Sequence, residues 1–210
     1  MNERPSVRIL VVDDHPMTRE GLCAVLSRFP ENCIVAEGNN GLEAIELYRL
    51  HKPDVVLMDL SMPQLDGLQA TRAIVKEFPE AQVVIFSASD GDETIYQSMR
   101  AGARSYLLKE TPAALLLETI AQVAAGQTYL PAELAAKLAS RLHLRDLTLR
   151  EQEVLEQIVA GRTNSEIGAT LFISEGTVKS HVNRILDKLH AHDRTQAAMT
   201  AIRRGLVQVG

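Results

Sequence analysis

The chain has 210 residues, of which 46% are hydrophobic and 23% are charged, and its formal net charge is −5. This composition is ordinary for a globular protein. No apolar stretch approaches the roughly 20 residues that cross a bilayer, and the N-terminal "MNERPSV" contains no apolar signal core. We therefore exclude a membrane-spanning or secreted protein and expect a cytoplasmic one.

The charge is divided unevenly along the chain. Residues 1–142 hold 13 Lys/Arg against 19 Asp/Glu, a net charge of −6, whereas residues 143–210 hold 9 against 8, a net charge of +1. This asymmetry suggests two parts with different roles, although the second part is not basic enough for charge alone to indicate nucleic-acid binding. Cys23 and Cys33 lack metal-ligand spacing and stand in apolar segments, so we expect reduced thiols in the core.

Short β-branched runs alternate with segments of helical spacing in the first 125 residues. The expected strands are 7–12, 33–38, 54–59, 82–88 and 104–109, and the expected helices are 18–28, 41–50, 67–78, 91–101 and 112–125. In the second helix, Leu42, Ile45 and Tyr48 are expected to face inward. The alternation predicts right-handed crossovers and a parallel sheet, which indicates an α/β doubly wound, flavodoxin-like domain.

The strand pattern stops after Gly126. Residues 128–146 contain a weak helix behind Pro131 and are expected to form a linker. The remainder is helical throughout, and four helix starts carry capping residues: Thr148, Thr163, Ser174 and Asp193. We therefore expect a small all-α four-helix domain over residues 147–210, after an α/β domain over residues 1–127.

The apolar run Val55–Met58, which we expect to be buried, leads directly into Asp59. Burying an ionised carboxylate is costly unless it is paired, metal-bound or neutralised. A solvated turn after the strand would explain Asp59 alone. Ligands of a doubly wound sheet, however, bind at the carboxyl ends of its strands, and the other strand ends also carry polar residues.

Those other residues are Asp13 and Asp14 after the first strand, Ser87 after the fourth and Lys109 after the fifth. Three carboxylates at one edge repel one another unless a cation lies among them, and oxygen ligands are what Mg²⁺ prefers. A carboxylate can also attack phosphorus and form an aspartyl phosphate. The joint pattern therefore predicts a Mg²⁺-dependent phosphoryl-transfer pocket.

The motifs "LVVDDHP", "VVLMDLSMPQLDG", "VVIFSAS" and "GARSYLLK" resemble, in order and spacing, those of two-component response regulator receivers over residues 7–125. The resemblance implies that a histidine kinase phosphorylates Asp59. It further implies that Asp13, Asp14, Asp59 and the backbone carbonyl of Ser61 bind Mg²⁺. Lys109 would pair with the phosphoryl oxygens, Ser87 would hydrogen-bond the phosphoryl group, and Tyr106 would be a switch that turns inward.

Several positions leave alternatives open or depart from that family. Tyr106 could instead be a strand tyrosine with its hydroxyl in water. His15 is expected to be a solvated histidine at a helix start. Serine at position 87 replaces the commoner threonine, and Glu110 follows Lys109 where many receivers have proline. Since a cis bond without proline is costly, we expect that loop to differ.

The segment "ISEGTVKSHVNRILDKL" (173–189) places five aliphatic residues on one stripe, which should pack inward: Val178, Val182, Ile185, Leu186 and Leu189. Its opposite face is polar, and a tight turn connects it to the helix that starts at Thr163. Helix, turn and polar second helix are the layout of a helix-turn-helix. A solvated face of any small bundle is the simpler alternative.

Residues 147–198 closely resemble the DNA-binding domain of the LuxR/NarL/FixJ group. The resemblance implies that Lys179, Ser180 and Asn183 face base edges of double-stranded DNA. The residues it implies for phosphate contacts are Thr163, Asn164, Thr177 and Arg184. Gly168 stands where the family commonly has alanine, which either permits close packing or weakens the helix.

The last helix, residues 193–204, contains Ala197, Ala198 and Ala201, which we expect to be exposed and to form the dimer contact typical of this family. Packing of these alanines within the domain is the simpler interpretation. A homodimer would bind two half-sites, and RNA polymerase would be a further partner.

The sequence thus indicates a response regulator rather than an enzyme, apart from its own phosphorylation and dephosphorylation at Asp59. Two alternatives stay open. A phosphatase with an aspartate nucleophile usually has a second aspartate two positions later, where this chain has Ser61. A DNA-binding protein that is active without phosphorylation is the other.

Overall fold

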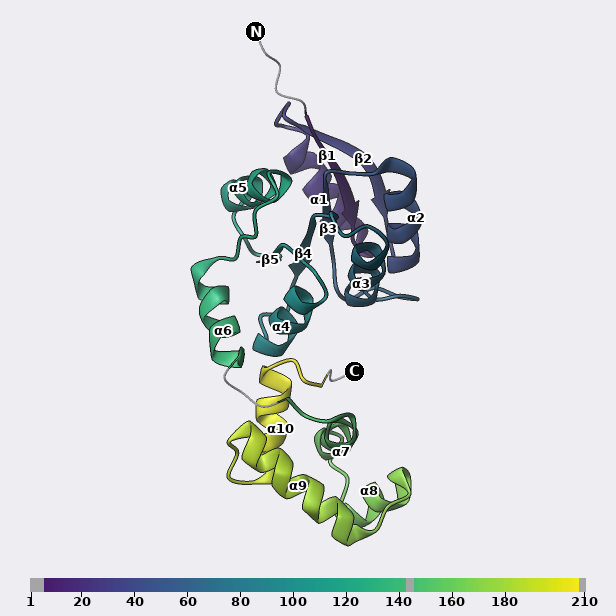
Figure 1. Cartoon of the computed structure of the whole chain (residues 1–210), viewed down its shortest axis with the longest axis vertical. Coiled ribbons are helices and arrows are strands. Elements are labelled where there is room, and N and C mark those ends of the chain that lie inside the picture. The colour runs from purple at the N-terminus through teal and green to yellow at the C-terminus, as the bar shows by residue number, and fades with distance from the viewer. Residues whose placement is uncertain (1–5, 143–145, 208–210) are drawn as a thin grey trace. The chain divides into compact units, whose positions relative to one another are not determined.

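The computed structural model describes residues 6–142 and 146–207 (Figure 1). By residue contacts the chain divides into two compact units, Met1–Ser89 with Gln97–Ala135, and Asp90–Tyr96 with Ala136–Gly210. The expected domain boundaries 1–127, 128–146 and 147–210 stay predictions. Within the described ranges, no helix has the length and apolar character needed to span a membrane.

A five-stranded parallel sheet forms the centre of the first unit. Its strands are β1 (Val7–Val12), β2 (Asn32–Gly38), β3 (Val55–Met58), β4 (Val83–Ser87) and β5 (Ser105–Leu108), in the spatial order β2-β1-β3-β4-β5. This is the order of a flavodoxin-like doubly wound fold, so the predicted fold class is confirmed. Every residue of β3 and β4 is buried, because strands at the centre of a parallel sheet are covered on both faces.

Helices follow each strand. They are α1 (Pro16–Leu26), α2 (Gly41–His51), α3 (Gly67–Glu77), α4 (Asp92–Arg100) and α5 (Ala113–Ala124). One core cluster joins α1 and α5 to alternate residues of the strands, so these two helices cover the same face of the sheet. Figure 1 shows α2 and α3 beside each other on the opposite face.

The inward face of α2 differs from the expected one. Leu42 is 48% exposed, whereas Gly41, Ala44 and Tyr48 are buried. The first turn of the helix packs closely on the chain before α3, since a Cβ on Gly41 would lie 2.5 Å from the carbonyl oxygen of Leu65. Only glycine fits at this contact. The expectation that Leu42 faces inward was therefore wrong.

The cysteines are reduced, but only one belongs to the interior. Cys23 on α1 is partly buried, and burial, reinforced by Glu37, raises the pKa of its thiol to about 11. Cys33 is exposed, since β2 is an edge strand of the sheet. The expectation of two core thiols was thus wrong for Cys33.

The later part of the chain is helical. Its helices are α6 (Ala132–Leu142), α7 (Leu149–Val159), α8 (Asn164–Leu171), α9 (Glu175–Leu189) and α10 (Arg194–Arg203). The four predicted N-caps are confirmed, because Thr148, Thr163, Ser174 and Asp193 each accept a hydrogen bond from the backbone three residues later. The predicted stripe of α9 packs on the core of α7, α8 and α10.

Three small residues pack closely in this part of the chain. Ala197 and Ala201 on α10 are fully buried in that core, so the simpler interpretation is correct for them, and the expected exposed alanine face was wrong. Gly168 on α8 permits a close approach, since an added Cβ would lie 2.7 Å from the carbonyl oxygen of Ile173 in the turn before α9.

Candidate functional site

Asp59 follows the buried strand β3 at the centre of the sheet and is itself only 3% exposed. Its backbone N–H donates to Val12 of the neighbouring strand at 2.9 Å, and its Oδ1 accepts from the N–H of Leu60 at 2.8 Å. The N-terminus of α3 packs closely against the backbone of Asp59, since a Cβ on Gly67 would lie 1.8 Å from the carbonyl oxygen of Asp59. The carboxylate is therefore held by strand pairing and by close packing, and not by a solvated turn.

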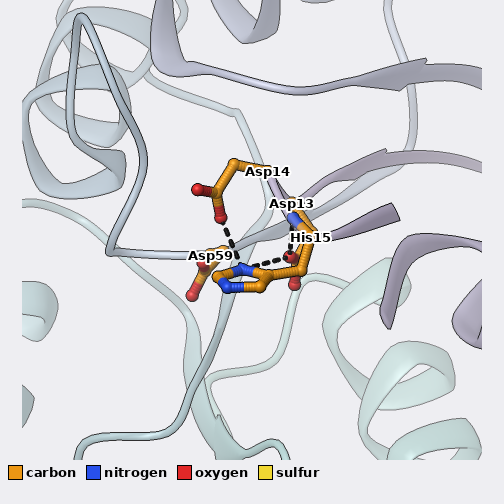
Figure 2. A group of neighbouring side chains, drawn as sticks. All are labelled: Asp13, Asp14, His15 and Asp59. Carbon is orange, nitrogen blue, oxygen red and sulfur yellow. Dashed lines mark hydrogen bonds and ion pairs between the residues drawn. The ribbon is translucent and has the colours of Figure 1, made fainter. Parts of the chain in front are cut away.

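Asp13 and Asp14 lie at the carboxyl end of β1 beside Asp59 (Figure 2). Asp13 is 1% exposed, and its Oδ1 accepts a hydrogen bond from the backbone N–H of His15 at 2.9 Å. The side chain of Asp14 is 26% exposed, so it forms the more open wall of the pocket. The predicted gathering of three carboxylates is present in the structure.

Lys109 completes this pocket from the end of β5. Its Nζ lies 2.8 Å from Oδ2 of Asp13 and 3.2 Å from Oδ2 of Asp59. Burial opposes the ammonium charge, but the contacts with both carboxylates outweigh it and raise the pKa of Lys109. The lysine therefore stays charged and offsets part of the negative charge around it.

The pKa of Asp59 is raised above its ordinary range. Burial is the largest cause and the charge of Asp13 adds to it, whereas Lys109 and the hydrogen bond from Leu60 act in the opposite direction. The ionised carboxylate is thus poorly stabilised by its surroundings. Its Oδ2 accepts no hydrogen bond of good geometry from the described residues, and neither does Oδ2 of Asp13. Both atoms face the ammonium of Lys109 and can accept a further cation or an electrophile.

Ser87 and Tyr106 are both linked to Ser89 in the loop after β4. The hydroxyl of Ser87, a residue only 2% exposed, accepts a hydrogen bond from the N–H of Ser89 at 3.2 Å. Tyr106 is fully buried, and its hydroxyl donates to the carbonyl of Ser89 at 2.6 Å. The alternative of a tyrosine with its hydroxyl in water is therefore wrong, and Tyr106 points inward in this structure.

The loop after Lys109 contains only trans peptide bonds, as do all the described residues. The Lys109–Glu110 bond therefore lacks the cis geometry that proline permits, as the sequence predicted. Ser61 is exposed in the loop after β3, and the role of its carbonyl oxygen stays a prediction.

Two residues at this pocket had no predicted role. His15 is the N-cap residue of α1, and its Nδ1 lies 2.7 Å from Oδ1 of Asp14 (Figure 2). Arg19, one turn into α1, donates to the carbonyl oxygen of Asp13 at 2.7 Å and pairs with Glu37 at 3.3 Å. The sequence held one signal for them: both follow the acidic pair at the start of a helix.

The polar face of α9 is exposed, as expected. Lys179, Ser180, Asn183 and Arg184 are all solvent-accessible, and Lys179 pairs with Glu175 on the same helix at 3.2 Å. This face therefore presents two cations and two short polar groups, while Val178, Ile185 and Leu189 fill the core beneath it.

The remaining candidates for DNA contacts also take part in the fold. Thr163 forms the capping box of α8 with Glu166, and the hydroxyl of Thr177 lies 2.8 Å from that of Ser174, the N-cap residue of α9. Asn164 is partly buried, and its Oδ1 lies 3.4 Å from Arg194. Their predicted contacts with phosphate would use groups that already stabilise helix ends.

Comparison with known proteins bears on both parts of the chain. The model of the response regulator receiver domain matches residues 9–121, and that of bacterial regulatory proteins of the luxR family matches residues 145–201. The chain is 40% identical to the transcriptional regulatory protein LiaR of Bacillus subtilis (strain 168), with 96% of this chain and 99% of LiaR covered. It is 36% identical to the transcriptional regulatory protein DegU of Brevibacillus brevis, with both chains fully covered.

Solved structures show the same two-part architecture. The crystal structure of the response regulator ChrA of a heme-sensing two-component system is 34% identical, with a TM-score of 0.58, and covers 97% of this chain and 100% of ChrA. A structure of two RcsB dimers bound to two parallel DNAs has a TM-score of 0.70 at 20% identity, covers 94% of this chain and 98% of that one, and supports the fold alone.

Proposed function

Because the chain belongs to the NarL/FixJ family of response regulators, with a receiver domain and a LuxR-type DNA-binding domain, we propose that phosphorylation of Asp59 controls it. The chain is a DNA-binding regulator of transcription whose family implies a histidine kinase as partner. One observation carries the assignment of the residue: Asp59 is a buried carboxylate with a raised pKa at the carboxyl end of the central strand, 3.2 Å from a charged lysine.

The pocket suits Mg²⁺. Asp13, Asp14 and Asp59 offer oxygen ligands, and each of these three carboxylates has a buried oxygen without a good hydrogen bond. We assign these three residues and the backbone carbonyl of Ser61 as the groups that would hold the cation. When bound, it would supply positive charge to a phosphoryl group at Asp59.

The transfer itself needs alignment and charge neutralisation more than acid–base catalysis. An oxygen of Asp59 forms a bond to phosphorus while the P–N bond of the kinase phosphohistidine breaks, and the electron pair leaves on the imidazole nitrogen. Lys109 pairs with a phosphoryl oxygen in place of Asp59. Attack of water on the same phosphorus later restores the carboxylate and releases inorganic phosphate. Phosphorylation and dephosphorylation at Asp59 are the reactions that the protein itself would perform.

The switch follows from the shared partner of Ser87 and Tyr106. A phosphoryl group at Asp59 would accept a hydrogen bond from the hydroxyl of Ser87, which now accepts from Ser89. Because Tyr106 also bonds to Ser89, a change in this loop changes the position of the aromatic ring. Phosphorylation thus shifts a population between two arrangements of the loop after β4.

DNA binding would use the exposed face of α9 in the major groove. Lys179, Ser180 and Asn183 are assigned to base edges and Arg184 to phosphate, with Thr163, Asn164 and Thr177 as further phosphate contacts. This assignment rests on the exposure of the four α9 residues and on the similarity to the luxR family model. We also propose that the chain acts in the cytoplasm, with RNA polymerase as a further partner.

A dimer would use α10, although not its alanines. Met199 is 65% exposed and Ile202 is 44% exposed, and with the exposed Thr195 they lie at spacings of four and three, on one face of the helix. A two-fold contact through this face would place two copies of α9 on two half-sites of DNA. Met199→Asp should then weaken binding to a paired site without changing phosphorylation.

The test is a titration of full-length chain against an operator selected from random DNA, with and without acetyl phosphate and Mg²⁺. Wild type should gain one phosphoryl group by mass and bind about tenfold more tightly, a usual size for coupling between two sites. Asp59→Asn should show neither effect. Asp54→Asn is the matched control, since Asp54 is exposed at the other end of the same strand.

Three outcomes would reject the proposal. Rapid phosphate release with no phosphorylated chain detectable by mass and no change in DNA binding would indicate a phosphatase. Normal binding and activation by Asp59→Asn would indicate a regulator that needs no phosphorylation. Equal effects of Asp54→Asn and Asp59→Asn would show that the acceptor lies elsewhere.

A further inference from the structure

His15 stands at the opening of the acidic pocket with its imidazole directed into it (Figure 2). Its Nδ1 lies 2.7 Å from Oδ1 of Asp14 and 3.6 Å from Oδ1 of Asp13. One oxygen from each of Asp13, Asp14 and Asp59, together with a ring nitrogen of His15, form a group of atoms that all lie within 4.8 Å of one another. The pocket therefore offers one nitrogen ligand in addition to its oxygens.

We infer that this pocket is also a binding site for a transition-metal dication of the Co²⁺, Ni²⁺ and Zn²⁺ class, with His15 as its nitrogen ligand. The inference rests on the proposed Mg²⁺ pocket and adds a second class of cation to it. Mg²⁺ takes oxygen ligands and keeps several waters, so it gains little affinity from an imidazole ligand. Transition-metal dications bind imidazole well, and their affinity for a mixed nitrogen and oxygen site is higher than that of Mg²⁺.

The backbone at His15 leaves the imidazole available for a metal. His15 is the N-cap residue of α1 in an extended conformation, but its side chain makes no capping hydrogen bond, and the helix instead begins with Pro16. The side chain is 67% exposed, so it can move toward a cation without disturbing the core. The helix therefore does not depend on this imidazole.

The two buried carboxylates, of Asp13 and Asp59, each offer an oxygen to the same ion. One oxygen of Asp13 and one of Asp59 are fixed by backbone N–H groups, from His15 and Leu60. Their second oxygens are buried without a hydrogen bond of good geometry and face only Lys109 among the contacts described. Both oxygens are therefore paired with one ammonium alone, and each has room to accept a further partner in the pocket.

The distances allow one cation to reach all four groups. Metal–ligand bonds of about 2.0–2.2 Å place ligand atoms about 3–4 Å apart around one ion. The largest separation here is 4.8 Å, so a shift of about 1 Å suffices. Asp14 and His15 are the more exposed members and can make that shift. A cation held this way has one position fewer for a phosphoryl oxygen, so it would compete with Mg²⁺ and slow phosphorylation.

The experiment measures binding of Co²⁺ and Mg²⁺ to the full-length chain at one fixed pH. Co²⁺ is followed by its visible absorption and Mg²⁺ by calorimetry. In wild type, excess Mg²⁺ should displace Co²⁺ and its absorption band should be lost. His15→Ala should weaken Co²⁺ binding about tenfold or more, as loss of a metal-site group does, and should leave the Mg²⁺ affinity within about threefold.

Two further variants separate ligation from other effects. His15→Gln can still donate a hydrogen bond to Asp14 but offers no imidazole, so it should behave like His15→Ala. His51→Ala removes a histidine at the end of α2 and should match wild type. Thermal unfolding of each variant checks that the fold is intact.

The inference is overturned if His15→Ala binds Co²⁺ as tightly as wild type, if His15→Gln restores the affinity, or if His51→Ala loses as much. It is also overturned if Mg²⁺ fails to displace bound Co²⁺ from a chain that binds both. Should wild type bind Co²⁺ through His15 but not Mg²⁺, the inference stands and the proposed Mg²⁺ cofactor is rejected instead.

Discussion

Two buried carboxylates have pKa shifts of opposite direction, although each lies close to a lysine. They are Asp59 in the receiver and Glu151 at the start of α7. They are 3% and 2% exposed, and each lies close to an ammonium, Lys109 at 3.2 Å and Lys188 at 2.7 Å. Nevertheless, the pKa of Asp59 is raised, and the pKa of Glu151 is lowered. Burial acts against both charges, so the difference lies in their other neighbours.

For Glu151, hydrogen bonds from Lys188 and from the backbone and hydroxyl of Thr148 outweigh burial. For Asp59, burial and the charge of the neighbouring Asp13 carboxylate both raise the pKa, and together they outweigh the lowering by Lys109. The comparison teaches that one carboxylate stabilises a helix end, whereas the other is held at a cost in free energy that a cation or a phosphoryl group would relieve.

The largest effect is expected from Gly67→Ala, which tests how tightly Asp59 is held. A Cβ would lie 1.8 Å from the carbonyl oxygen of Asp59, so the start of α3 or the strand end must move. We expect a loss of about 3 kcal/mol, at the upper end for overpacking, in the receiver transition of a urea unfolding curve. Gly21→Ala is the control, because its Cβ meets nothing within 4 Å, and it should stabilise by about 0.5–1 kcal/mol.

Glu151→Gln tests the other half of the comparison. The amide keeps the shape of the side chain but loses the charge-assisted hydrogen bond with Lys188. We expect a loss of about 2 kcal/mol, measured by the same unfolding method in the transition of the C-terminal domain. Gln152→Glu, on the exposed side of the same helix turn, should change little. A Glu151→Gln variant as stable as wild type would remove the contrast with Asp59.

The pH dependence should have opposite signs at the two sites. Asp59→Asn should be more stable than wild type at neutral pH without divalent cations, because the ionised carboxylate opposes folding. That advantage should shrink as pH falls through the raised pKa of Asp59 toward the ordinary value of 3.8, since folded wild type then takes up the proton first.

The stability that Glu151 contributes should instead be complete above its ordinary pKa of 4.5 and disappear as pH falls through its lowered value. Thermal unfolding of wild type and both variants against pH measures these two trends. Parallel curves for Asp59→Asn and Glu151→Gln would contradict the comparison.

The smallest effect concerns the turn between α8 and α9. Phe172 is 94% exposed and adopts a left-handed conformation with φ of 56°. This conformation costs free energy for most residues with a Cβ, but less for asparagine, whose short polar side chain can hydrogen-bond locally. Phe172→Asn should therefore stabilise the C-terminal transition by about 0.5–1 kcal/mol. Phe172→Ala, which keeps the Cβ and loses little packing, should leave it nearly unchanged, and an equal gain from both would exclude this explanation.

Local patterns were sufficient for the elements and the pocket. Strand β1 begins and ends where its β-branched run does, and the four C-terminal caps form as predicted, because capping depends on residues three positions apart. The gathering of Asp13, Asp59 and Lys109 followed from chain order alone, since the carboxyl ends of parallel strands meet at one edge.

What the sequence determined by itself, then, is which residues form each strand and helix and which strand ends carry charge, because these depend on neighbours along the chain. Only the tertiary structure decided that Leu42 is exposed, that Ala197 and Ala201 are buried, and that His15 and Arg19 contact the acidic pair. Each depends on how a helix is rotated against a surface it meets across space. At α2, for example, the close contact of Gly41 with the backbone of Leu65 leaves no room for a Cβ, and such a contact gives no periodic signal in the sequence.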